Sequence, residues 1–282
     1  MSNETILGGL DPEVLDEITT RRGALAHAGR WGLRAAMASV PLAFAGMAKS
    51  AFAQSGLPAN VVAVLNFALT LEELEAEFYV RGMAAPGLIP AADRTIFGTI
   101  RDHEVVHVQF LRDVLGSQAV AKPTFDFSAG GLFNPFGNYA QFTILAQAFE
   151  DTGVRAYKGQ APELLGTPGV LRAALTIHSV EARHASEVRR LRGNFSEQEP
   201  QQGWITLNLA GTGVPSQVFP VYAGEENLVQ AGIDISTLPG QGNPIGPRQA
   251  SESFDEPLTR QQVLEIVDAF IVGDVDGDGT EA

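Results

Sequence analysis

The chain has 282 residues and no cysteine, and its 19 Lys and Arg against 33 Asp and Glu give a formal net charge of −14. This acidity argues against nucleic acid or an anionic membrane as a partner, because both are bound by basic surfaces. The absence of cysteine excludes disulfides, zinc–thiolate sites and thiol nucleophiles. Residues 194–282 hold a net −12 of the charge, with Arg248 and Arg260 as their only bases.

Residues 1–53 have the order of features that is typical of an export signal. The pair Arg21-Arg22 precedes a short apolar stretch at 35–48, and small residues surround a cleavage position after Ala53. This pattern favours a twin-arginine signal, and the apolar stretch is too short for a membrane span. We therefore predict a periplasmic or extracellular mature protein without a membrane span. An amphipathic helix at 24–49 is the alternative.

Residues 54–193 are predicted to form four helices. A proline stands near the start of each helical pattern and a glycine near its end, where each is favoured. The predicted helices cover 58–82, 90–116, 137–159 and 168–193. Residues 117–136, between the second and third helices, are numerous enough for one long crossover along a four-helix bundle.

Two of these helices carry a Glu-x-x-His pair on the stripe of apolar residues that should face the core. The pairs are Glu104 with His107 and Glu181 with His184. A buried carboxylate without a partner is strongly destabilising, so something must neutralise these side chains. Two such pairs on helices of similar length indicate a bound metal.

The other two helices extend the pattern into an internal repeat. Glu72 and Glu150 lie on the inner stripes, and each is followed seven residues later by a tyrosine, Tyr79 or Tyr157. These residues repeat at an interval of 78, and the two Glu-x-x-His pairs repeat at 77. The repeat of a two-helix unit predicts a pseudo-twofold bundle whose ligands meet at its axis.

The converging side chains match the ligand set of helical dimetal carboxylate sites. The predicted metal ligands are Glu72, Glu104, His107, Glu150, Glu181 and His184. Four carboxylates balance two divalent cations, and a set rich in carboxylates suits Fe or Mn better than Zn or Cu. In this hypothesis Glu104 and Glu181 bridge two Fe or Mn ions and the other ligands are terminal.

Several motifs resemble those of the ferritin-like domain family that includes plant desiccation-related proteins and bacterial members exported by the twin-arginine route. They are Leu71–Tyr79 (LEELEAEFY), the two Glu-x-x-His pairs, Tyr222–Asn227 (YAGEEN) and Ser253–Thr259 (SFDEPLT). The resemblance covers nearly all of the mature chain. It implies an all-α, ferritin-like four-helix bundle with a dimetal centre, and it implies no particular activity.

Some residues near the predicted centre have two interpretations. Glu75, one turn after Glu72, is the alternative ligand, although Glu72 keeps the repeat interval. Tyr79 and Tyr157 are either core aromatics or residues that bind the ligands or carry a radical. Glu73 and Glu77 are assigned to a solvated face. His103 is assigned to the surface or to contact with a ligand.

The C-terminal third, 194–282, is rich in glycine and proline and is predicted to wrap on the bundle. Its aromatic residues argue against a free tail. Residues 204–207 are expected as a strand or an ordered loop, and 258–271 as a short helix capped by Thr259. Asp274–Gly279 resembles the start of a calcium loop but is better explained as an acidic tail.

The favoured function is that of an exported oxidoreductase in which a dimetal centre handles O2, peroxide or Fe(II) during stress. Ferroxidase and manganese-catalase chemistry use the same ligands, so the sequence does not choose between them. The alternative is a non-enzymatic desiccation or stress protein on the same scaffold. Whether the chain forms a homo-oligomer is left open, and a storage cage is disfavoured because the C-terminal wrap would crowd subunit contacts.

Overall fold

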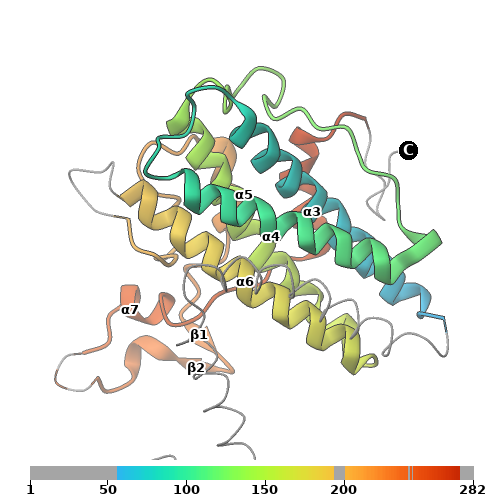
Figure 1. The fold of residues 1–282 in the computed structure, drawn as a ribbon. Helices are drawn as coiled ribbons and strands as arrows, with labels where there is room; N and C mark the ends of the chain where they lie inside the picture. Colours follow the sequence, from blue (N-terminus) through green and yellow to red (C-terminus); the bar gives the residue numbers. More distant parts are fainter. Residues whose placement is uncertain (1–55, 194–200, 241, 243, 274–282) are drawn as a thin grey trace, which may run out of the picture. The chain divides into compact units, whose positions relative to one another are not determined.

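The computed structural model describes residues 56–193, 201–240, 242 and 244–273 (Figure 1). The predicted export signal and the motif Asp274–Gly279 lie outside the described residues, and the division of the chain at Ala53 stays a prediction. Within the described part, four long helices precede a C-terminal segment of short elements. None of the helices in that part combines the length and the apolar character that crossing a membrane requires.

The four long helices lie where the sequence predicts them. They are α3 (Ala59–Ala84), α4 (Arg94–Leu115), α5 (Tyr139–Gln160) and α6 (Pro168–Gly193). Helix α4 begins four residues later than predicted because the Pro90 carbonyl accepts from the N–H groups of Asp93 and Arg94, which forms a separate turn. Asn138 caps α5 by accepting from the Gln141 N–H at 3.2 Å.

Helix α3 runs antiparallel to both α4 and α5. Near the start of α3, the Asn66 side chain donates to the Gln118 carbonyl, just after α4, at 2.9 Å. Near the end of α3, Phe78 stacks on Phe142 of α5 with ring centroids 4.8 Å apart. Helix α4 therefore ends at one end of the bundle and α5 begins at the other. Residues 119–138 must run along the bundle between them, which confirms the predicted long crossover.

The apolar core forms two clusters, and a layer of charged residues lies between them on every long helix. In α4, Phe97 and Ile100 belong to one cluster and Leu111 and Leu115 to the other. The predicted ligands Glu104 and His107 fall between these pairs, fully buried or nearly so. The helices therefore place charge at the middle of the bundle, flanked by hydrocarbon on both sides.

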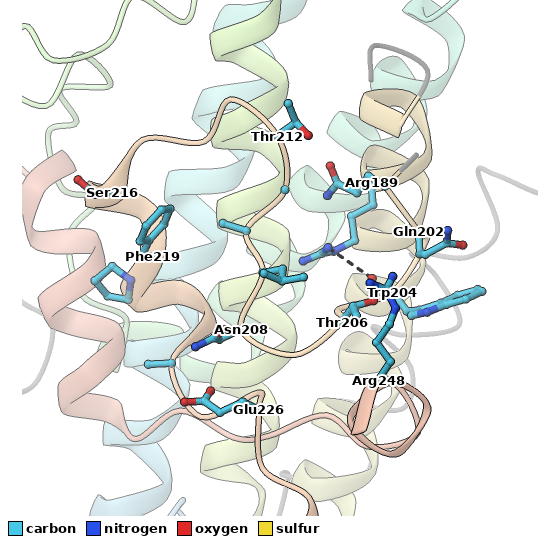
Figure 2. Close-up of a pocket in the computed structure, with 16 residues that line it drawn as sticks. Arg189, Gln202, Trp204, Thr206, Asn208, Thr212, Ser216, Phe219, Glu226 and Arg248 are labelled. Carbon is cyan, nitrogen blue, oxygen red and sulfur yellow. Dashed lines mark hydrogen bonds between the residues drawn. The ribbon is translucent and has the colours of Figure 1, made fainter. Parts of the chain in front are cut away.

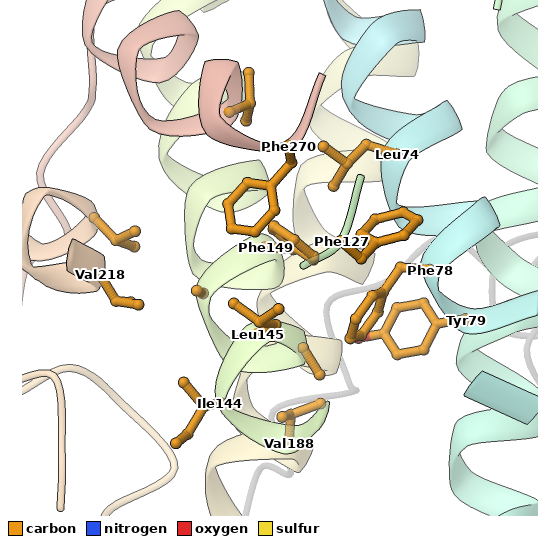
Figure 3. Packing of buried hydrophobic residues seen from close by; sticks show 14 of the residues in the cluster. Leu74, Phe78, Tyr79, Phe127, Ile144, Leu145, Phe149, Val188, Val218 and Phe270 are labelled. Carbon is orange, nitrogen blue, oxygen red and sulfur yellow. The ribbon is translucent and has the colours of Figure 1, made fainter. Parts of the chain in front are cut away.

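One cluster is dominated by aromatic side chains. Phe78 packs against Phe127 from the crossover and against Phe149 from α5, with ring centroids 5.3 and 5.1 Å apart (Figure 3). Phe270, from the C-terminal segment, packs edge-on against Phe149 at 5.0 Å. The crossover and the C-terminal segment thus share one core with the bundle.

The C-terminal segment consists of short elements. They are the 3₁₀ helix η3 (Ser216–Tyr222), the hairpin β1 (Val229–Gln230) with β2 (Ile233–Asp234), η4 (Ile235–Thr237), α7 (Pro247–Ser251), α8 (Arg260–Val267) and η5 (Asp268–Phe270). Thr259 caps α8, as predicted, through a capping box with Gln262. Residues 204–207 form turns and loop. The hairpin was not predicted, since its strands have only two residues each.

A buried arginine on α5 attaches this segment to the bundle. Arg155 is paired with Glu225 at 2.9 Å, and it donates to the carbonyls of Glu256 at 2.8 Å, Ala223 at 2.6 Å and Val221. Glu225 also accepts from the N–H of Glu256 at 3.0 Å. The YAGEEN and SFDEP motifs therefore meet at one guanidinium, which attaches these described parts of the segment to α5.

Candidate metal centre

The structure brings the six predicted ligands together at the middle of the bundle. Helices α3 and α5 each contribute one glutamate, and α4 and α6 each contribute a Glu-x-x-His pair. The four glutamates are fully buried, and the histidines are at most 8% exposed. The helical period explains this placement, because residues three apart lie on the same face.

The six side chains form two groups that share two carboxylates. In each group, one possible ligand atom from every residue lies within 4.8 Å of the others. One group is Glu72, Glu104, His107 and Glu181, and the other is Glu104, Glu150, Glu181 and His184. Glu104 and Glu181 therefore occupy the positions that would bridge two ions.

Both imidazoles direct Nδ1 at the carboxylates. His107 Nδ1 lies 3.1 Å from an oxygen of each of Glu72, Glu104 and Glu181. His184 Nδ1 lies 2.7 Å from Glu104 Oε1 and 3.3 Å from Glu150 Oε2. Each imidazole thus faces the carboxylates of one group through the same ring nitrogen.

Several buried polar atoms of the centre lie within ion-pair distance of one another but make no hydrogen bond of regular geometry. They are Glu104 Oε1, Glu150 Oε2, both carboxylate oxygens of Glu181, and His184 Nδ1. Buried polar atoms are rarely left unpaired, and a cluster of them requires an explanation. A cation at the point where their lone pairs converge satisfies all of them, so the donor set fits a bound metal.

The pKa shifts of these side chains also favour a bound cation. Burial raises the pKa of Glu72 to about 7, and burial together with Glu104 raises the pKa of Glu181 well above its ordinary value. For Glu104, burial acts upward, but His107 and His184 hold its pKa below the ordinary value. The raised pKa values of Glu72 and Glu181 favour the binding of protons or cations in this buried layer.

Residues 60–194 match the family model of the ferritin-like domain. The chain contains a ferritin-like domain. The matched range covers all six predicted ligands and all four long helices except the first residue of α3, in agreement with the predicted fold. No curated protein in the comparison matches the chain.

Two tyrosines of the ferritin-like domain connect its two halves. Tyr79 of α3 donates to Glu150 of α5 at 2.5 Å, and Tyr157 of α5 donates to Glu72 of α3 at 2.5 Å. The bonds are related by the repeat, and each joins one half to the glutamate of the other. The sequence singled out both tyrosines, but it did not show that the bonds cross.

Glu75 lies in the same buried layer as Glu72, but it belongs to neither of the two groups. It is 3% exposed, and burial followed by the charge of Glu181 raises its pKa well above the ordinary value. Gly153 makes room for it, because a Cβ at Gly153 would lie 3.1 Å from Glu75 Oε1 and 3.3 Å from Glu181 Oε2. The centre thus contains a fifth carboxylate, on one side only.

His103 contacts one of the two imidazoles. Its Nδ1 lies 2.9 Å from His184 Nε2, and the two rings stack with centroids 5.2 Å apart. With the hydrogen on Nε2 of His184 and donated to His103, the Nδ1 of His184 keeps its lone pair for a cation. Contact with a ligand was one of the two interpretations of His103, and the structure supports it.

Glu73 differs from its prediction as a solvated side chain. It is 5% exposed and pairs with Arg112 at 2.5 Å and with Lys122 at 3.4 Å. The crossover residue Lys122 also pairs with Glu77 at 2.7 Å. Ion pairs with residues that are distant in the sequence, including one in the crossover, bury Glu73. No local pattern in the helix predicts this burial.

A wide cleft of about 870 Å³ lies elsewhere, between α6 and the C-terminal segment (Figure 2). Arg189, Trp204 and Arg248 lie on one side of it and Phe219 on the other. None of the six predicted ligands lines it. The cleft is therefore separate from the buried centre.

Proposed function

We propose that this protein binds two Fe or Mn ions at the buried centre and acts on O2, peroxide or Fe(II) in stress protection outside the cytoplasm. The observation that carries the proposal is the pair of groups that share Glu104 and Glu181 and contain buried polar atoms without a hydrogen bond. Two such ions, when bound, supply redox steps of one electron each. The export part of the proposal rests on Arg21-Arg22 and the cleavage pattern before Gln54.

The protein's own side chains would prepare the centre for that chemistry. The two apolar clusters on either side keep bulk water away from the charged layer. Tyr79 and Tyr157 orient Glu150 and Glu72 through short hydrogen bonds, and His103 fixes the ring of His184. Such supporting contacts set the direction of a ligand and its affinity for the metal.

Metal content of the purified full-length chain, expressed in medium supplemented with Fe or Mn, tests the proposal. We expect two equivalents per chain, and loss of metal in Glu104→Gln and Glu181→Gln. The matched control is Glu163→Gln, which changes an exposed glutamate in the same way and should keep both ions. A wild-type protein without stoichiometric Fe or Mn would overturn the proposal.

Turnover then separates the redox function from the non-enzymatic one. The loaded protein should disproportionate peroxide or oxidise Fe(II), and Glu104→Gln should abolish both. Equal and negligible rates in the loaded wild type and in this variant would support a stress protein that acts through its scaffold alone. Secretion of a fusion to residues 1–53, compared with Arg21→Lys/Arg22→Lys, tests the export signal.

A further inference from the structure

A cluster of four aromatic rings connects the metal centre with the edge of the bundle. Tyr79, bound to Glu150, lies with its ring centroid 6.2 Å from both Phe97 and Phe142. The same two phenylalanines lie 6.2 and 6.3 Å from Tyr139, at the first position of α5. The two tyrosines are therefore joined through two parallel aromatic contacts.

Tyr139 has the partner that a redox-active tyrosine requires. It is half-buried, and its hydroxyl donates to Asp93 Oδ2 at 2.7 Å. Burial and this hydrogen bond raise the pKa of Tyr139, so the phenol does not ionise on its own. An electron can leave the ring only if the proton leaves too, and Asp93 is placed to accept it.

The other half of the repeat has no such connection. Tyr157 bonds to Glu72 as Tyr79 bonds to Glu150, but the other buried members of its cluster are aliphatic. Phe110 is only partly buried against that cluster, and the structure gives Tyr157 no ring contact among the described residues. At the repeat interval of 78, the positions of Tyr139 and Phe142 correspond to Val61 and Val64. The aromatic cluster is thus specific to one side of a nearly symmetric centre.

We propose that Tyr139 is an electron-transfer residue that donates one electron to the metal centre through Phe97, Phe142 and Tyr79. This inference rests on the proposed function, in which peroxide oxidises the centre. The Tyr139 phenol loses one electron to the oxidised centre, and its proton passes to Asp93, which leaves a neutral tyrosyl radical. A soluble one-electron reductant of the ascorbate class then restores the phenol, with the proton returning from Asp93.

The test is freeze-quench electron paramagnetic resonance of the metal-loaded, full-length protein after mixing with peroxide. We expect a tyrosyl signal in the wild type that ascorbate removes and that changes its hyperfine pattern with ring-deuterated tyrosine. Tyr139→Phe should lose this signal, and Asp93→Asn should strongly reduce it. Tyr222→Phe is the matched control, because it removes a buried tyrosine hydroxyl that donates to Asp151, outside both the metal centre and the four-ring cluster, and it should keep the signal.

Metal content and circular dichroism of every variant are measured first. A signal that persists in Tyr139→Phe, or the absence of a signal in a wild type that binds metal and consumes peroxide, would overturn the role of Tyr139 alone. A wild type that binds neither Fe nor Mn would overturn the proposed function and this inference with it. Loss of the signal in Tyr222→Phe, with its metal retained, would also contradict the assignment.

Discussion

Gly153 stands at the position of the repeat that corresponds to Glu75, and the side chain that it lacks would lie 3.1 Å from the Glu75 carboxylate. The two helices therefore differ at the one place where a symmetric centre would put two extra carboxylates in contact. Gly153 on α5 leaves the space that the Glu75 side chain on α3 occupies. The two halves of the centre are consequently unequal.

Gly153→Ala should lower the affinity of the centre for metal. The added methyl group approaches Glu75 and Glu181 more closely than side chains normally pack, so one of these carboxylates must move. Isothermal titration with Mn(II) measures the effect. The control is Gly98→Ala in α4, where the added carbon lies 3.4 Å from the flexible Met83 side chain. It should stabilise the helix by up to about 1 kcal/mol and leave the affinity unchanged.

Substitution of shared and unshared ligands should give different metal stoichiometries. Glu104→Gln and Glu181→Gln each remove a residue common to both groups and should lose both ions. Glu72→Gln and Glu150→Gln each affect a single group and should retain about one ion per chain. Elemental analysis of the four variants measures the number of ions bound per chain. Equal losses in all four would show that the two groups do not bind separately.

The metal-free protein should become less stable as the pH rises between about 5 and about 8. Burial raises the pKa of Glu72 to about 7, and although burial lowers the pKa of His184, Glu150 and Glu104 raise it well above normal. The folded state then holds protons that the unfolded chain has released, so the free energy of unfolding falls with rising pH. Urea titrations at several pH values measure the slope.

The metal-loaded protein is the comparison for this dependence of the free energy of unfolding on pH. Metal replaces the protons, and its binding strengthens as they are released at higher pH. Added metal should therefore reverse the trend over the same range. Glu72→Gln should flatten the slope of the metal-free protein, whereas Glu163→Gln should not. A stability of the metal-free protein that rises with pH would contradict the prediction.

Arg155→Met should strongly destabilise the protein. It leaves Glu225 buried without its partner and removes the donor to three backbone carbonyls. Loss of one member of a buried ion pair costs about 3–5 kcal/mol. Denaturant unfolding, monitored by circular dichroism, measures the loss. Arg155→Met/Glu225→Gln should recover part of it, and an unchanged unfolding midpoint in the single variant would show that Arg155 does not anchor the segment.

Much of the fold and of the centre could be predicted because the relevant signals are local. A Glu-x-x-His spacing on an apolar stripe places Glu104 with His107 on one helix face, and the repeat interval relates that face to Glu181 and His184. The boundaries of α6 follow from Pro168 and Gly193.

The rest depends on contacts between residues far apart in the sequence. Glu75 is part of the centre because Gly153, on another helix, leaves it space. Glu73 is buried because Lys122 arrives from the crossover. Arg155 offers no local signal, since its role is defined by carbonyl groups more than 60 residues away. The helical period predicts on which face of its helix a residue lies. It does not predict which residues of other elements pack against that face.

The sharing of ligands between the two hairpins gives the crossover a further role. Each ligand group takes at least one carboxylate from the other hairpin, so neither α3 with α4 nor α5 with α6 holds a complete group. Residues 119–138 therefore act as a tether that sets the effective concentration of one half-site for the other. Assembly of the centre is thereby an intramolecular event, and its completeness should not depend on how dilute the protein is.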